Sequence, residues 1–150
     1  MTPKLYTALK WGALLGGPLA IFETFGYLMA LNAGSIDVYD ATNTLGNLLE
    51  IAVPVAAGWL AVRATGERRS GLIAGLTVGV IVAAVNMVTE LVVPGSALST
   101  LSGQPPVSGG DLIVSILTTR ALTLGLGAWG GWLGGRLQSI AKPPTQPPRP

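Results

Sequence analysis

The sequence predicts an all-α integral membrane protein, built as a bundle of four transmembrane helices. Hydrophobic residues make up 49% of the 150 residues and charged residues only 11%. The mean hydropathy is +0.57, and a typical soluble domain carries about twice this share of charged residues. The apolar residues gather in four runs. Because a chain in lipid must form its backbone hydrogen bonds internally, each run is expected to be a helix.

Each apolar run is long enough to cross a bilayer. A helix rises about 1.5 Å per residue, so about 20 residues cross a hydrocarbon core of roughly 30 Å. The expected spans are residues 11–31, 45–62, 71–93 and 112–133.

Local signals mark the ends of the later spans. Pro94 and Gly95 cannot easily continue a helix and are expected to end the third span. Asp111 is expected to be the N-cap of the fourth span, because its carboxylate can accept from exposed backbone N–H groups. Residues 1–141 are expected to form one transmembrane domain. The sequence KPPTQPPRP at 142–150 predicts an extended, disordered tail.

Charged residues outside the spans differ between the two sides of the predicted membrane. The basic residues share one side: Lys4, Lys10, Arg63, Arg68, Arg69, Arg136, Lys142 and Arg149. In the loops of the other side, the charged residues are all acidic: Asp37, Asp40 and Asp111. The positive-inside rule therefore predicts that both termini lie in the cytoplasm. The protein is expected in the plasma membrane.

An internal repeat relates the two halves of the chain. The second and fourth spans both end in Gly-Trp-Leu-x-x-Arg, at 58–63 and 131–136, and their preceding spans open with Gly-x-x-x-Gly at 12–16 and 71–75. The pattern predicts two helical hairpins of the same orientation, a parallel repeat. Aromatic rings and cations are both favoured at the headgroup boundary. Four residues are therefore expected to be interfacial anchors: Trp59, Arg63, Trp132 and Arg136.

Glycines recur at a spacing that places them on single helix faces. Small residues at this spacing let helix backbones approach closely in lipid. The residues expected to pack helices are Gly12, Gly16, Gly75, Gly79, Gly127 and Gly131. Val78 is expected to point away from this face.

These glycine patterns resemble those of small glycine-rich four-helix membrane proteins of prokaryotes, which are known only as domains of unknown function. The residues that carry the resemblance are the Gly-x-x-x-Gly openings, the turn GWLAVRATGERRSGLIAG and the end GGWLGGR. The resemblance implies a fold type and a membrane. It implies no functional residue.

Polar residues inside the spans form a candidate site in the outer half of the bundle. Helical rise places the ionisable members within about 12 Å of the outer ends of their spans. Each of the three carboxylates has an amide or a phenol one helical turn away, on the same face of its helix. The expected cluster is Glu23, Glu50, Glu90, Arg120, Asn47, Asn86 and Tyr27.

Arg120 needs a partner, because a charge near mid-membrane costs about 2.5 to 3.5 kcal/mol. Glu23, at matching depth, is the expected one. Three carboxylates around one guanidinium would leave two excess negative charges if all were ionised. At least one glutamate is therefore expected to carry a proton near neutral pH.

The composition also excludes several functions. The chain contains no cysteine and no histidine, which removes thiolate and imidazole chemistry and the usual zinc sites. No nucleophile with a base and no phosphate-binding loop is visible, so neither an enzyme, nor a metal, nor a cofactor is expected. A net charge of only +2, without a basic face, predicts no nucleic-acid partner.

Two functions remain. The first is a non-enzymatic scaffold or accessory subunit, whose partners would be the bilayer and either a second copy or a larger membrane complex. The alternative is a small proton- or cation-coupled transporter that uses the intramembrane carboxylates. The glutamate of the first span is similar in place to that of small multidrug-resistance exporters, which do not pair it with a fourth-span arginine.

Overall fold

The predicted all-helical fold is confirmed. A computed structural model describes residues 1–92 and 109–141. Its helices are α1 (Pro3–Ala33), α2 (Ile36–Thr65), α3 (Arg68–Val92) and α5 (Gly109–Ala141). Each of the four is long and apolar enough to cross a membrane, so the protein is a multi-pass membrane protein by length and composition.

The turn between α1 and α2 is much shorter than the sequence suggests. The expected second span begins at Leu45, whereas α2 begins at Ile36. Gly34 ends α1 in the left-handed conformation, at φ 61°, and the Ser35 side chain caps α2 by accepting from the Val38 N–H. The start of the apolar run indicates where the membrane core begins. The helix itself begins earlier in the sequence, because it extends through polar residues to its N-cap.

The predicted cap of the last helix is wrong. α5 begins at Gly109, so Asp111 lies in its first turn and not at the N-cap. A carboxylate in the first turn still interacts favourably with the positive end of the helix dipole. Pro94 and Gly95, which are expected to end the third span, and the expected disordered tail at 142–150 lie outside the described residues.

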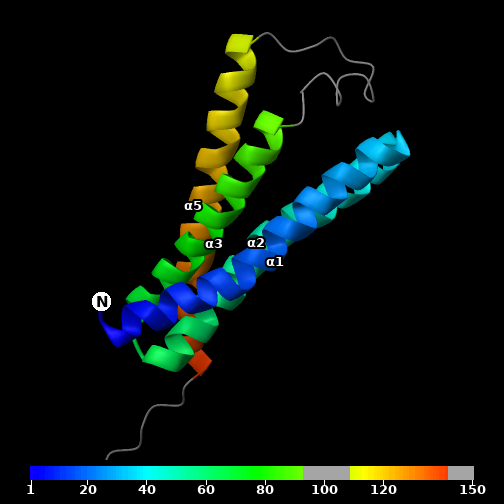
Figure 1. Cartoon of the computed structure of the whole chain (residues 1–150). Helices are drawn as coiled ribbons and strands as arrows, with labels where there is room; N and C mark the ends of the chain where they lie inside the picture. Colours follow the sequence, from blue (N-terminus) through cyan, green and yellow to red (C-terminus); the bar gives the residue numbers. More distant parts are fainter. Residues whose placement is uncertain (93–108, 142–150) are drawn as a thin grey trace, which may run out of the picture.

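The helices form two hairpins that cross. Figure 1 shows α1 beside α2 and α3 beside α5; the two pairs cross near the N-terminus and diverge toward the other end. The main contacts join α1 and α5 each to α2 and α3, and join α2 to α3. α1 and α5 therefore lie on the diagonal of the bundle.

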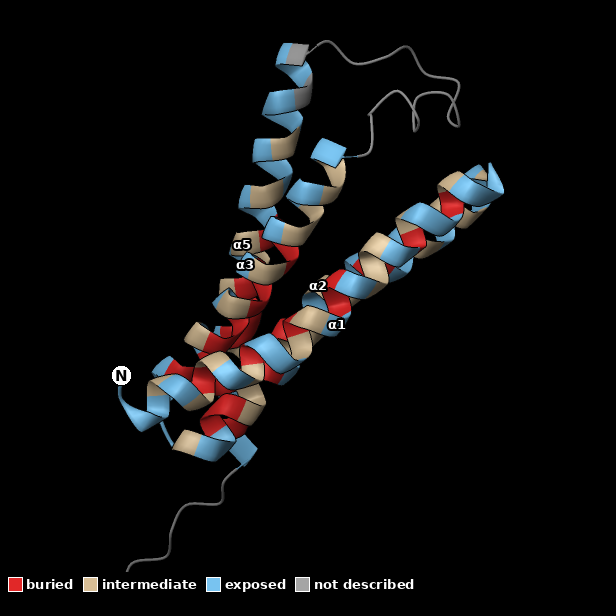
Figure 2. Ribbon diagram, in the orientation of Figure 1, coloured by how far each residue is buried: buried red, intermediate tan, exposed pale blue. Residues whose placement is uncertain are grey.

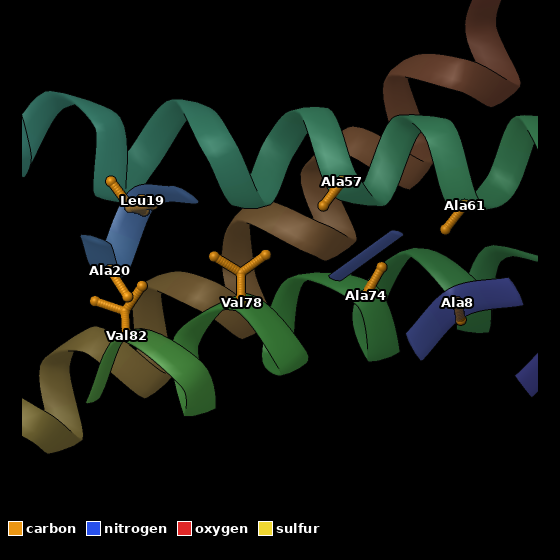
Figure 3. Close-up of a cluster of buried hydrophobic side chains, with 8 residues drawn as sticks. All are labelled: Ala8, Leu19, Ala20, Ala57, Ala61, Ala74, Val78 and Val82. Atoms are coloured by element: carbon orange, nitrogen blue, oxygen red, sulfur yellow. The ribbon is translucent and has the colours of Figure 1, made fainter. Parts of the chain in front are cut away.

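The core lies where the hairpins cross (Figure 2). Small side chains dominate it, and Figure 3 shows Ala8, Leu19, Ala20, Ala57, Ala61, Ala74, Val78 and Val82. Val78 is only 1% exposed, so the expectation that it points away from the helix contact is wrong. The face of α3 that packs is wider than its glycines alone indicate.

The six glycines predicted to pack helices all lie where another helix approaches closely. A Cβ atom at Gly75 would lie 2.5 Å from the Gly131 Cα, and one at Gly127 would lie 2.7 Å from the Gly75 carbonyl oxygen. On α1, a Cβ atom at Gly12 would lie 2.5 Å from the Thr77 Cβ. Since real Cβ atoms do not approach this closely, α3 can reach α5 and α1 only with glycine at these places.

We expect Gly75→Ala to lower the free energy of unfolding by about 1 to 3 kcal/mol, because the added methyl group meets the α5 backbone. Gly125 is the matched control, since it is exposed on α5 with open space around its Cα. Gly125→Ala should stabilise the helix by about 0.5 to 1 kcal/mol. Thermal unfolding of both variants in detergent measures the difference, and equal stabilities would contradict the assigned contact.

Candidate functional site

A polar cavity of about 300 Å³ lies among all four helices, on the side of the core where the hairpins diverge. Every residue of the predicted polar cluster lines it: Glu23, Tyr27, Asn47, Glu50, Asn86, Glu90 and Arg120. Further polar residues were missed from the sequence: Thr24, Tyr39, Thr42, Asn43, Thr89 and Thr119. Three of these missed residues, Tyr39, Thr42 and Asn43, lie in the first turns of α2, where the sequence predicts a loop.

Arg120 forms its ion pair with Glu90 and not with Glu23, so the predicted pair is wrong. The Arg120 guanidinium donates to Glu90 Oε1, and only 12% of the arginine side chain is exposed. α5 packs against α3, which carries Glu90, whereas Glu23 belongs to the diagonal helix α1. Helical side chains also lean toward their own N-terminus. Because α3 and α5 run in opposite directions, the two side chains lean toward each other.

Glu23 instead contacts α3 through an amide. Asn86 Nδ2 donates to Glu23 Oε2 at 2.5 Å. The other side of the carboxyl group lies over Gly46 of α2, where a Cβ atom would be 3.4 Å from Glu23 Cγ. Glu23 therefore lies between α3 and α2, in ordinary van der Waals range of Gly46.

Glu50 contacts the fourth helix in the same way. The Thr123 hydroxyl donates to Glu50 Oε1 at 3.3 Å. Thr123 is 4% exposed and was not in the predicted cluster, although it lies one turn from Arg120 on the same face. Each of the three carboxylates thus has a hydrogen-bond partner on another helix.

The cavity also has an aromatic wall, at its end nearer the turn between α1 and α2. The rings of Tyr27 and Tyr39 pack edge to face, with centroids 6.4 Å apart and planes at 70°. The pair joins α1 to the first turns of α2.

Some polar atoms of the site have no partner in the described part of the chain. They are Glu23 Oε1, Glu90 Oε2 and Arg120 Nε. A buried polar atom without a hydrogen bond is costly, and each of these residues lines the cavity, so water or a polar ligand there would satisfy them. Residues 1–92 and 109–141 contain no group of three acidic side chains placed to hold a metal ion.

The predicted anchors lie at the opposite end of the bundle. The Arg63 guanidinium lies over the Trp59 ring, 5.1 Å from its centroid, and Arg136 lies over Trp132 at 4.4 Å. Stacking of this kind is a cation–π interaction. The two Gly-Trp-Leu-x-x-Arg segments therefore have the same local geometry.

Comparisons with protein-family models, with curated proteins and with solved structures find no match to this chain.

We expect Arg120→Leu to lower stability by about 1 to 3 kcal/mol, because it leaves the Glu90 carboxylate, which is partly exposed to the cavity, without its charged partner. Adding Glu90→Gln should recover much of this loss, since both charges then leave together. Adding Glu23→Gln instead should recover little. Thermal unfolding in detergent compares the double variants, and better recovery with Glu23→Gln would mean that the arginine is paired with α1.

Proposed function

We propose that this protein is a non-enzymatic scaffold or accessory subunit of the plasma membrane, with a polar cavity that faces outward. The observation that carries the proposal is the difference between the two halves of the bundle. One half contains the cavity, and directly below it the helices are joined by close glycine and alanine contacts.

The packed half argues against a path across the membrane. Below the cavity, Val78 and Val82 are each 1% exposed and Ala57 and Ala74 are fully buried. The backbones of α3 and α5 touch at Gly75 and Gly131. A solute that enters the cavity would meet side chains and backbone at van der Waals contact, which is the packing of a closed core.

The distribution of charge supports the orientation. The start of α1, the turn between α2 and α3 and the end of α5 lie at one end of the bundle (Figure 1), and this end carries the basic residues. Under the positive-inside rule it is the cytoplasmic end. The matching Trp–Arg stacks of α2 and α5 at this end support a parallel repeat of two hairpins.

Proton- or cation-coupled transport is the second candidate, and two carboxylates favour it. Glu23 and Glu50 accept hydrogen bonds from neutral groups, Asn86 and Thr123, and neither forms an ion pair within residues 1–92 and 109–141. A carboxylate that faces a cavity without a basic partner is a suitable cation or proton site. Transport would then require the packed half to open.

Cysteine labelling separates the two candidates, because the chain has no cysteine of its own. Thr89→Cys places a thiol on the cavity wall, and Val78→Cys places one in the packed half of the same helix without adding volume. We expect a membrane-impermeant maleimide to label Thr89→Cys from the outside only. Val78→Cys should react from neither side, yet react fully in denaturing detergent. Labelling of Val78→Cys in the folded protein would favour transport.

Reporter fusions test the orientation. A fusion truncated after Arg68 should be cytoplasmic, and one truncated near Asp37 should be external, because basic residues are retained on the cytoplasmic side. Alkaline phosphatase activity reports an external end and fluorescence of a cytoplasm-folding protein reports an internal one. An external signal after Arg68 would reverse the proposed orientation.

A further inference from the structure

A second cleft, of about 260 Å³, lies at the end of the bundle opposite the polar cavity. It lies between the first turns of α1 and α3, which Figure 1 shows close together beside the N-terminus. This cleft plays no part in the function proposed above.

The first turn of α3 offers free hydrogen-bond donors at this cleft. Within the described residues, the N–H groups of Arg68 and Arg69 donate to no acceptor, and the Ser70 N–H turns back to the Glu67 carbonyl at 3.1 Å. The start of a long helix carries unsatisfied N–H groups and the positive end of the dipole, and both favour an anion.

Ser70 gives an independent sign of a ligand. Its side chain lines the cleft, yet the residue is only 3% exposed. Its hydroxyl makes no hydrogen bond with any described residue. An unpartnered hydroxyl on an almost fully buried residue that lines a cleft can bond to a polar group that enters the cleft.

Two basic side chains and one acidic side chain border the cleft. Lys4 Nζ forms an ion pair with Glu67 Oε1 at 2.5 Å. An ammonium group has three N–H donors, so two remain available after this contact. Arg69 is exposed and forms no ion pair within the described residues. The three charged side chains thus leave one net positive charge, to which the end of α3 adds.

We propose that this cleft binds the phosphate of an anionic membrane phospholipid. Arg69, Lys4 and the Ser70 hydroxyl are placed to donate to the phosphate oxygens. Leu5 and Ile73 supply an apolar wall to the same cleft, which suits the glycerol and the first acyl carbons. The cleft lies at the ends of membrane-spanning helices, where headgroup phosphates are concentrated, and a basic pocket between helices at this depth is a usual lipid site.

The test measures the thermal stability of the full chain in detergent as phosphatidylglycerol is added. We expect the lipid to raise the unfolding temperature, and Arg69→Gln to raise the half-maximal lipid concentration about fivefold. Ser70→Ala should raise it by a similar factor of about five. Lys10→Gln removes a basic residue from the same end of α1 outside the cleft, and it should leave the concentration within about twofold.

Other ligands and the other variants complete the test. Inorganic phosphate and diacylglycerol should each give a much smaller shift than phosphatidylglycerol. A full shift with phosphate alone would make this a free-anion site, and a full shift with diacylglycerol would make it an apolar groove. An equal loss in Arg69→Gln and Lys10→Gln, with no loss in Ser70→Ala, would reduce the effect to general attraction of charge. Any of these results overturns the proposal. If Ser70→Ala does not fold, Arg69→Gln still tests the proposal, because Arg69 is exposed.

Discussion

The backbone contact between α3 and α5 is the constraint on which the rest of the structure depends. In lipid, helices gain little from burying apolar side chains against one another, so association relies on close packing. Gly75 and Gly131 allow the two backbones to touch, and the fully buried Ala57 and Ala74 pack beside this contact. Straight helices that cross at an angle can touch this closely over only part of their length. The two hairpins also touch at this end, because a Cβ atom at Gly58 of α2 would lie 2.7 Å from the Gly131 Cα of α5. They therefore separate toward the other end.

The polar residues occupy the space that this separation creates. Water can reach a cavity between diverging helices, which makes carboxylates there far less costly than in lipid. Two of the three carboxylate contacts, Glu23 with Asn86 and Glu50 with Thr123, join one hairpin to the other. The contact between Glu90 and Arg120 lies within the second hairpin. Hydrogen bonds across the gap hold the ends of the hairpins at a fixed distance, where glycine packing no longer can.

The sequence predicts the helices and the chemistry of the cavity better than the pairing within it. Apolar runs locate the spans, but the start of α2 depends on a cap at Ser35 that lies outside any apolar run. The apolar pattern therefore does not indicate that Tyr39 is helical and lines the cavity. Helical spacing brings the polar residues to one face of each helix. Helical spacing does not indicate which helices are neighbours. For this reason depth alone predicts an ion pair of Arg120 with Glu23, which lies on the diagonal helix. Thr123 was detectable, because it lies one turn from Arg120.

The two polar sites share a pair of helices. α1 and α3 contribute Glu23 and Asn86 to the cavity at one end, and Lys4 and Ser70 to the cleft at the other. Between the sites, α1 meets α3 at Gly12, with Thr77 and Ala74 against it. Because the core there is too tightly packed to compress, a change in the angle at which the two helices cross would change their separation at both ends. That angle sets the width of the cavity and of the cleft together.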